Sequence, residues 1–412
     1  MAFGIYVHVP YCLQRCSYCD FATYEQKSIL PIADYFTVLH QEVDQRQAMI
    51  ADRTIKSVYF GGGTPSLAPP SFIIALLDKF SKLGFTFAPN AEITIEINPA
   101  TLDQDRLQQL IAGGVNRFSV GAQTFNDRLL KLAGRRHCAN DTIKTLDLLR
   151  AQPTNYTLDL LFALPTQRLS DLVCDLEQIT QIAPPHVSAY CLTVPNKHPM
   201  NAGRPREPVQ LKMFALIEES LARIGLQRYE ISNFSRPGYE SRHNLIYWQN
   251  ESFWGIGLSA HSYLPSAPWG VRFWNPSEVG AYVKQIRDGQ IRLSEDNSRP
   301  QSNYPEDQFE DLALHQALTD FCHMRLRTMR GLEKNALCSM FPAVAAEEVQ
   351  YRLARMVERG WLETIESSWR LSAEGLLVSN QVFLELTFLR DDLFTESGWT
   401  NSIPNPIPRP SS

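Results

Sequence analysis

Three cysteines near the start of the chain have a spacing suited to metal chemistry. Cys12, Cys16 and Cys19 form the pattern C-x3-C-x2-C and directly follow a β-type run over residues 6–9. Three thiolates in one loop can hold three irons of a cubane cluster and leave the fourth iron without a protein ligand. An open iron is a chemical site, whereas a cluster with four cysteine ligands is mainly an electron carrier. The spacing therefore predicts an iron–sulfur cluster that can bind a small molecule.

A structural zinc ion is the alternative for the same loop. Zinc sites of the Cys3His type exist, and His8 or a remote residue would supply the fourth ligand. The protein would then be a non-catalytic, zinc-stabilised α/β scaffold. The remaining cysteines lie among apolar neighbours, where we expect small buried side chains; they are Cys138, Cys174, Cys191, Cys322 and Cys338.

Further polar or glycine-rich positions follow the next β-type runs. Gly61-Gly62-Gly63-Thr64-Pro65 comes after the second run, where glycine permits positive φ and free N–H groups can hold polar ligand atoms. A plain tight turn is the alternative, because the segment matches neither the P-loop nor the G-x-G-x-x-G pattern. Glu96 and Gln123 end the third and fourth runs, and Asp159 lies within the fifth. Buried carboxylates need a cation or hydrogen-bond donors. A ligand with an amine, a sulfonium or ribose hydroxyls would provide these. The alternative is that arginine side chains of the protein pair with the carboxylates.

Six β-α units in a row are predicted to position these residues. The β-type runs cover residues 6–9, 57–60, 92–97, 117–121, 157–162 and 187–192. The helical patterns between and after them cover residues 32–49, 71–83, 103–112, 139–150, 169–182 and 209–224. Such an alternation predicts a parallel sheet, either open and doubly wound or curved into a partial barrel. In both cases the functional residues lie at the carboxyl ends of the strands.

Changes in composition predict four parts of the chain. They are a barrel core over 1–235, an aromatic- and glycine-rich region over 236–300, a small mainly helical domain over 301–390, and a disordered tail over 391–412. Within the third part we expect a first helix over 309–327, a two-stranded wing over 361–365 and 369–371, and a last helix over 373–386.

Composition excludes several classes of protein. The net charge is 39 − 44 = −5, and no apolar stretch is long enough for a membrane helix. An acidic chain makes nucleic acid an improbable partner. The first residues lack the features of a signal peptide, so we expect a cytoplasmic protein, with peripheral membrane association left open.

Taken together, the motifs resemble the radical S-adenosylmethionine superfamily. The first three are Tyr6-x-His8-x-Pro10-x-Cys12-x3-Cys16-x-Tyr18-Cys19, Gly61-Gly62-Gly63-Thr64-Pro65-Ser66 and Glu96-x-Asn98-Pro99. Three others are typical of its coproporphyrinogen-oxidase-like branch: Arg117-x-Ser119-x-Gly121-x-Gln123-Thr124-Phe125, Gly134-Arg135-Arg136-His137 and Asp159-x4-Leu164-Pro165. The heme chaperones of that branch are marked by His243-Asn244-x2-Tyr247-Trp248 and Gly255-x-Gly257-x2-Ala260-His261-Ser262. The resemblance extends from Tyr6 to about residue 389.

The resemblance implies a partial (β/α)6 TIM-like barrel with a small winged-helix-like C-terminal domain. It also implies a [4Fe-4S] cluster on the three cysteines and S-adenosylmethionine chelating the open iron. By position, the residues that line the S-adenosylmethionine site are Tyr6, Tyr18, Gly62, Gly63, Thr64, Glu96, Gln123, Arg135 and Asp159. The implied heme site is His243, Asn244, Tyr247 and Trp248. An ordinary hydrogen-bonded histidine and core aromatics are the alternative for that string, and for His261, Met324 and Met329 we expect packing roles.

Two functions compete within the branch. Oxygen-independent coproporphyrinogen III oxidases use the 5′-deoxyadenosyl radical to decarboxylate propionates, whereas the heme chaperones bind heme and deliver it to respiratory membrane proteins. The oxidases continue the cluster motif with a further cysteine, where this chain has Asp20-Phe21. They also carry a long N-terminal segment, and only residues 1–5 precede Tyr6 here, so we expect that element to be missing. The resemblance therefore favours a heme chaperone without oxidase activity, and leaves its oligomeric state open, a homodimer included.

Some positions depart from the pattern of the family. Ala122 and Ala163 stand where glycine or a hydrophobic residue is usual, and we expect the methyl group of Ala163 to disturb little. Val194-Pro195-Asn196 replaces a stretch in which an acidic residue precedes Thr-Pro. This last difference leaves the substrate side of the barrel, and any catalysis there, open.

Overall fold

A computed structural model describes residues 2–266, 268–289 and 308–390. The chain forms two compact units. Unit 1 comprises Met1–Leu245, Phe253–Ser262 and Trp274–Gln308, and unit 2 comprises Ile246–Ser252, Tyr263–Phe273 and Phe309–Ser412. The predicted region 236–300 therefore contributes to both units. The predicted tail, 391–412, lies outside the described residues.

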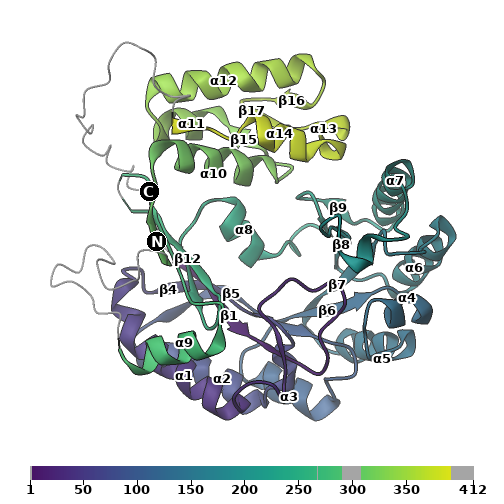
Figure 1. The fold of residues 1–412 in the computed structure, drawn as a ribbon, viewed down its shortest axis with the longest axis vertical. Coiled ribbons are helices and arrows are strands. Elements are labelled where there is room, and N and C mark those ends of the chain that lie inside the picture. Colours follow the sequence, from purple (N-terminus) through teal and green to yellow (C-terminus); the bar gives the residue numbers. More distant parts are fainter. Residues whose placement is uncertain (1, 267, 290–307, 391–412) are drawn as a thin grey trace. The chain divides into compact units, whose positions relative to one another are not determined.

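The centre of unit 1 is a parallel sheet of six strands that neighbour one another in chain order (Figure 1). These strands are β1 (Ala2–Val9), β4 (Thr54–Gly62), β5 (Thr86–Ile97), β6 (Arg117–Gln123), β7 (Asn155–Phe162) and β8 (His186–Cys191). At one edge β11 (Phe253–Ile256) runs parallel to β1. At the other, β10 (Asn233–Ser235) is antiparallel to β8 and is followed by β9 (Gln227–Arg228). The predicted α/β class is confirmed.

Helices connect the strands of unit 1 and cover the apolar side of the sheet. The longer ones are α1 (Ile32–Arg46), α2 (Pro70–Lys82), α3 (Gln104–Ala112), α5 (Ala139–Arg150), α6 (Leu169–Ile182), α7 (Glu207–Arg223) and α9 (Val279–Arg287). Shorter elements are η1 (Gln47–Met49), η2 (Pro65–Leu67), η3 (Pro199–Asn201), α4 (Asp127–Leu132) and the parallel pair β2 (Tyr11–Cys12) and β3 (Tyr24–Glu25). The sequence pattern gave no indication of α4, which begins where the Asn126 side chain accepts the N–H of Arg128 and Leu129.

The two sides of the sheet differ in chemistry. On β1 the alternating residues Phe3, Ile5 and Val7 are fully buried and apolar. The residues between them include Tyr6 and His8, and the corresponding positions of the neighbouring strands carry further polar groups. The interior of a barrel is usually filled with branched aliphatic side chains. A polar interior therefore indicates that this face serves a function beyond packing.

Unit 2 contains the predicted helical domain and its wing. Its helices are α10 (Leu314–Leu326), α11 (Lys334–Met340), α12 (Ala343–Glu358), α13 (Ala373–Leu377) and α14 (Ser379–Glu385), and its small sheet has the order β15 (Leu332–Glu333), β17 (Ser368–Leu371), β16 (Leu362–Ile365). The first helix begins later than predicted, because β14 (Phe309–Asp311) pairs with β13 (Val271–Trp274). The single last helix that we predicted is divided in two at Val378.

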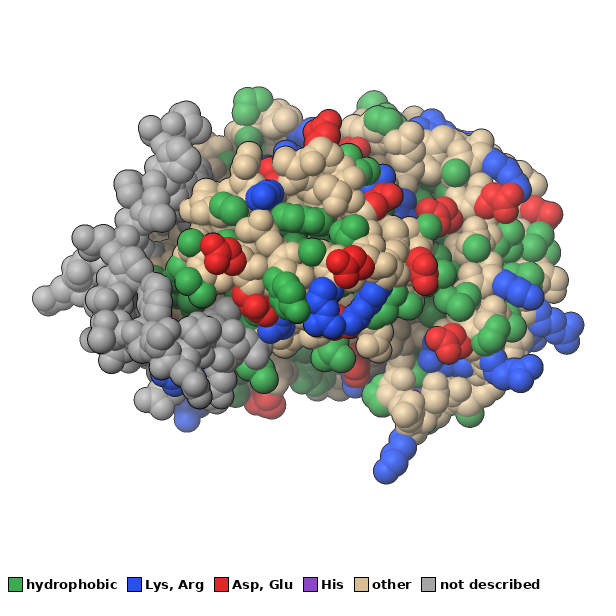
Figure 2. All heavy atoms as spheres, turned by 90° about the horizontal axis from the view of Figure 1, so that it is seen from above, with side chains coloured by type: hydrophobic (Ala, Val, Ile, Leu, Met, Phe, Trp, Pro, Cys, Tyr) green, Lys and Arg blue, Asp and Glu red, His purple; other side chains and the backbone are tan. Residues whose placement is uncertain are grey.

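Three elements in the described part of the chain contain residues of both units: β12 (His261–Leu264), α8 (Arg242–Trp248) and β13, whose last residue is in unit 1. No helix in the described part of the chain is both long and apolar enough to span a bilayer. Figure 2 shows acidic, basic and hydrophobic side chains interspersed on the face drawn there. Such mixing fits the small net charge of −5.

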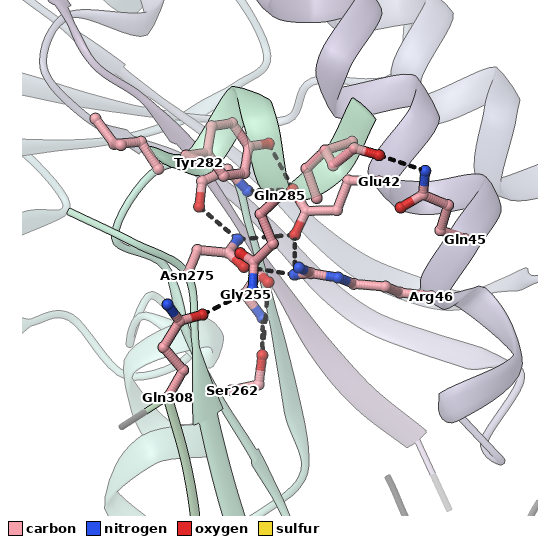
Figure 3. Close-up of polar contacts among 12 residues, drawn as sticks. Glu42, Gln45, Arg46, Gly255, Ser262, Asn275, Tyr282, Gln285 and Gln308 are labelled. Carbon is pink, nitrogen blue, oxygen red and sulfur yellow. Dashed lines mark hydrogen bonds and ion pairs between the residues drawn. The ribbon is translucent and has the colours of Figure 1, made fainter. Parts of the chain in front are cut away.

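A buried polar network joins Glu42 and Arg46 on α1 to Asn275 and Tyr282 (Figure 3). The Glu42 carboxylate, fully buried, accepts hydrogen bonds from Arg46 Nη1 at 2.6 Å and Asn275 Nδ2 at 2.7 Å. It also accepts from the hydroxyl of Tyr282 at 2.6 Å and the N–H of Gly257 at 2.9 Å. Four donors around one carboxylate offset much of the cost of burying its charge.

Candidate functional site

The cysteine loop is held in place by the protein at the carboxyl end of β1. Its two ends run alongside each other in β2 and β3, where the N–H of Tyr24 donates to Pro10 O at 2.8 Å. The N–H of Ser17 donates to Ala133 O at 3.0 Å, and a Cβ at Gly134 would lie 2.9 Å from Ser17 Oγ. Glycine at position 134 therefore allows the segment after α4 to pack closely against the loop.

Each predicted cluster cysteine has at least one polar side chain directed at its sulfur. Thr64 Oγ1 donates to Cys12 Sγ at 3.9 Å, and Arg135 Nη1 donates to Cys16 Sγ at 3.5 Å. Cys19 Sγ lies 3.6 Å from Thr23 Oγ1. Burial raises the pKa of the Cys12 thiol to about 11. Donors around sulfur stabilise the negative charge that cluster ligation places there, so this loop fits a metal–sulfur cluster.

His8, the residue considered for a zinc site, has both ring nitrogens engaged. Its Nδ1 lies 3.0 Å from the Tyr6 hydroxyl, and its Nε2 lies 2.9 Å from Ala22 O, within the cysteine loop. Burial lowers the pKa of His8 to about 4, which keeps the ring neutral. In the described residues, no three His, Cys, Asp or Glu side chains are gathered as around one metal ion. His8 thus anchors the loop.

The three consecutive glycines are required by close packing. A Cβ at Gly61 would lie 2.8 Å from Cε1 of Tyr59, and one at Gly62, where φ is +108°, would lie 2.5 Å from the His8 ring. The N–H of Gly63 donates to Val9 O at 2.9 Å, and that of Gly62 to Glu96 Oε2 at 3.1 Å. In this arrangement the turn uses these N–H groups within the protein, where we had considered them for a ligand.

Two carboxylates lie in the polar interior, Glu96 on β5 and Asp159 on β7, with β6 between the two strands. Glu96 Oε1 accepts a hydrogen bond from the Tyr59 hydroxyl at 2.8 Å, and burial raises the pKa of Glu96 to about 7. Asp159 Oδ2 accepts from Ser119 Oγ at 3.1 Å, and burial raises its pKa as well. Each carboxylate still has lone pairs available for further donors. The pair therefore suits a ligand that carries an amine or hydroxyl groups.

Arg135 connects the cysteine loop with the ends of β5 and β6. Besides Cys16, its guanidinium donates through Nη2 to Asn98 Oδ1 and Gly121 O. A Cβ at Gly121 would lie 3.1 Å from this Nη2 and also 3.1 Å from Gln123 Nε2, so glycine leaves room for both side chains. The buried Arg135 Nε has no hydrogen-bond partner among the described residues, so it can donate to an anionic ligand group.

The remaining predicted residues of this site have mixed surroundings. Gln123, at the end of β6, has a φ of +66°, a backbone conformation that is uncommon for residues other than glycine. Tyr18 packs against a hydrophobic cluster that includes Leu129, Leu161 and Leu164. Ala163, where glycine is usual, has a φ of +61°. That conformation explains why glycine suits this position.

The predicted heme string lies on α8 and contains residues of both units. In unit 1, the His243 side chain is 1% exposed and its Nδ1 lies 2.7 Å from Ser57 Oγ, while the Asn244 N–H donates to Ser241 Oγ at 3.3 Å. In unit 2, burial raises the pKa of Tyr247, and the Arg327 guanidinium lies 4.8 Å from the ring centre of Trp248. Three of the string's side chains are thus largely packed within their own unit.

Several residues that support the site from within the sheet were not predicted from the sequence. Tyr59 and Ser57 lie three and five positions before the end of β4, and Ser119 lies four positions before the end of β6. All three lie on the same face as the site. Glu92 is buried lower on β5 and accepts the N–H groups of Arg242 and His243, each at 3.1 Å. The period-2 alternation of polar residues in runs that are otherwise apolar was the signal for this set.

Comparisons with known proteins identify relatives of the chain. The model of the Radical SAM superfamily matches residues 6–178. The chain is similar to the heme chaperone HemW of Haemophilus influenzae, with 30% identity over 399 residues that cover 94% of this chain and 98% of the relative. It is similar to the heme chaperone HemW of Escherichia coli, with 30% identity over 391 residues, 93% of this chain and 97% of the relative.

A solved structure agrees at the level of the fold. Coproporphyrinogen III oxidase (HemN) from Escherichia coli, a radical SAM enzyme, aligns with a TM-score of 0.76 over 94% of this chain and 90% of that chain, at 21% sequence identity. Membership of the superfamily implies a [4Fe-4S] cluster and S-adenosylmethionine. The two HemW relatives match this chain over nearly their whole length, which establishes the family within the superfamily. The chain therefore belongs to the HemW family of heme chaperones within the radical SAM superfamily.

Proposed function

We propose that this protein is a heme chaperone that binds a [4Fe-4S] cluster, S-adenosylmethionine and heme, and transfers heme to respiratory membrane proteins. The observation that carries the proposal is the set of three cysteine thiols, each with its own polar contact, beside two buried carboxylates and the guanidinium of Arg135. We further propose that it acts in the cytoplasm and meets its acceptors at the membrane surface.

The cofactor site follows from the chemistry of the side chains. Cys12, Cys16 and Cys19 would hold the cluster, whose open iron supplies a coordination site for the amino and carboxylate groups of S-adenosylmethionine. Glu96 and Asp159 accept hydrogen bonds from hydroxyl or ammonium groups, and Arg135 offers a buried donor near Cys16. Tyr6, Tyr18, Gly62, Gly63, Thr64 and Gln123 complete the proposed site.

The proposed heme site is the string on α8. Tyr247 and Trp248 offer flat apolar surface for a porphyrin, and His243 and Asn244 precede them on the same helix. The family relationship supports heme as the ligand. Substitution of each residue decides which of them contacts heme.

The experiment that tests the function is anaerobic. The cluster is reconstituted, S-adenosylmethionine and a reductant are added, and coproporphyrinogen III and heme are offered in separate samples. We expect stoichiometric heme binding, followed by transfer to a heme-free respiratory membrane protein, and no protoporphyrinogen. Turnover of coproporphyrinogen III would make the protein an oxidase instead, and heme that is bound without transfer would contradict the chaperone function.

A further inference from the structure

His243 is placed by two strands of the barrel. The N–H groups of Arg242 and His243, at the start of α8, each donate to the buried carboxylate of Glu92 on β5 at 3.1 Å. The imidazole Nδ1 lies 2.7 Å from Ser57 Oγ on β4. The side chain is only 1% exposed. These contacts hold the ring inside the sheet's polar face rather than at the protein surface.

The ring of His243 belongs to a stack of aromatic rings. It lies 5.1 Å from the ring of Tyr59 at an interplanar angle of 24°, and 6.5 Å from the ring of Tyr6. Tyr6 and Tyr59 in turn stack at 6.2 Å and 24°. Burial, together with the nearby Arg117 guanidinium, lowers the pKa of His243 to about 3. The histidine therefore contributes a neutral flat ring on which the two tyrosines rest.

The hydroxyl groups of these tyrosines reach the proposed S-adenosylmethionine site. Tyr59 donates to Glu96 Oε1 at 2.8 Å, and the Tyr6 hydroxyl lies 3.0 Å from His8 Nδ1. The space above Tyr59 is already full, because a Cβ at Gly61 would lie 2.8 Å from Tyr59 Cε1 and 3.1 Å from Glu96 Oε1. The tyrosine ring thus has Gly61 on one side and the stack on the other. Loss of the His243 ring opens space into which Tyr59 can tilt away from Glu96.

We propose that His243 is a positioning residue of the S-adenosylmethionine site: it supports Tyr59, whose hydroxyl orients the Glu96 carboxylate toward the ligand. The inference rests on the proposed binding of S-adenosylmethionine. It changes the role of the histidine within the heme string and leaves Asn244, Tyr247 and Trp248 as the proposed heme residues. Through His243, the first turn of α8 is then connected to the cofactor site.

The test measures the affinity of cluster-loaded protein for S-adenosylmethionine by equilibrium dialysis, with four variants. His243→Ala removes the support, His243→Phe keeps a flat ring, and Tyr59→Phe keeps the stack but lacks the donor. Phe118→Leu is the control for general core damage, because Phe118 is equally buried on β6 and lies on the opposite face from Arg117. Iron content and the cluster spectrum are recorded for each protein.

We expect His243→Ala and Tyr59→Phe each to weaken binding about tenfold, the effect of losing one hydrogen bond to a charged group. His243→Phe should retain the wild-type affinity, and the double variant His243→Ala/Tyr59→Phe should lose no more than either single variant. The S-adenosylmethionine-induced change in the electron paramagnetic resonance signal of the reduced cluster should be reduced in the same two variants. Should His243→Phe fail to fold, Tyr59→Phe and the double variant decide the question.

Three outcomes would overturn the inference: a wild-type affinity in His243→Ala, additive losses in the double variant, or an equal loss in Phe118→Leu. A heme titration of His243→Phe separates the two roles, because loss of the wild-type Soret band with unchanged S-adenosylmethionine affinity would make His243 a heme ligand instead. If the wild-type protein binds S-adenosylmethionine but no heme, the proposed chaperone function fails while the affinity series still decides the role of His243.

Discussion

The Glu96 carboxyl is expected to make the stability of the iron-free protein depend on pH. Burial raises its pKa from 4.5 to about 7, so the folded protein keeps a proton that the unfolded chain has lost between these values. The contribution of Glu96 to the free energy of unfolding is therefore present at low pH and is lost as the pH rises through 7. We predict that the stability difference between wild type and Glu96→Gln falls over this window and is constant above it, as measured by urea unfolding.

Asp159 and Asp175 also have raised pKa values, so only the difference between the two proteins reports on Glu96. Glu96→Gln keeps the size of the side chain and can still accept from the Tyr59 hydroxyl. A difference that does not change between about pH 5 and 8 would show that the carboxyl titrates normally.

The Cys16 thiol is expected to be essential for the cluster. Its Sγ accepts a hydrogen bond from Arg135 Nη1 at 3.5 Å. It is one of three free thiols in the cysteine loop. We predict that Cys16→Ala removes the brown absorption and most of the bound iron after anaerobic reconstitution, while the far-ultraviolet circular dichroism is retained. Cys174→Ala, on α6, is the matched control and should bind iron as the wild type does. The expectation of a buried side chain was wrong for Cys174, as it was for Cys191 and Cys338, because all three are exposed. Full iron binding in Cys16→Ala would remove this residue from the ligand set.

The roles of single residues could not be predicted from the sequence where they depend on contacts with residues far away in the chain. The cysteine spacing, the glycine run and the acidic strand ends could be recognised locally. The use of the Gly62 and Gly63 N–H groups by Glu96 and Val9 could not, because it depends on how neighbouring strands align. The burial of His243 against Ser57 likewise joins residues 186 positions apart.

The secondary structure elements were predicted well where a single pattern repeats. Five of the six strands and the helices between the strands lie within about four residues of the expected ranges, since alternating apolar positions fix both the period and the buried face. The strand β5 begins six residues before its expected start at residue 92. The region after the barrel was harder. Helix α8 begins where Glu92, on a strand about 150 residues earlier, accepts its first N–H groups. Ser241 caps the same end locally, because its Oγ accepts the N–H of Asn244 at 3.3 Å.

The network around Glu42 gives a prediction about how elements are held together. Its carboxylate joins α1 to α9 through Tyr282 and to the Gly257 turn that follows β11. Removing one partner from a buried ion pair leaves the other uncompensated, so we predict that Glu42→Ala lowers the free energy of unfolding by about 3–5 kcal/mol. Urea unfolding followed by circular dichroism measures this loss.

The control for this prediction has the same sequence spacing. Glu219 and Arg223 on α7 also form an i,i+4 pair, but their side chains are 63% and 65% exposed. Glu219→Ala should cost less than about 1 kcal/mol, since water already solvates both charges. Equal losses in the two variants would mean that the Glu42 network contributes no more than a surface ion pair.

At the scale of the molecule, the fold and the cofactor site depend on different interactions. The strands of unit 1 are held by apolar burial on one face, with Phe3, Ile5 and Val7 fully enclosed. The cysteine loop is fixed by hydrogen bonds of its own, such as His8 Nε2 with Ala22 O at 2.9 Å. We therefore expect the barrel to form without the cluster, in contrast to small domains that fold only around a metal.

Removal of iron should consequently separate stability from ligand binding. We predict that chelator-treated, iron-free protein retains its circular dichroism and a cooperative thermal transition. At a hundredfold excess over Kd, S-adenosylmethionine should add up to about 3 kcal/mol to the stability of the cluster-loaded protein and so raise its Tm. The Tm of the iron-free protein should not change. Differential scanning calorimetry of both forms measures the shift. An iron-free protein without a cooperative transition would show that the cluster organises the barrel, and an equal Tm shift in both forms would place the ligand away from the cysteine loop.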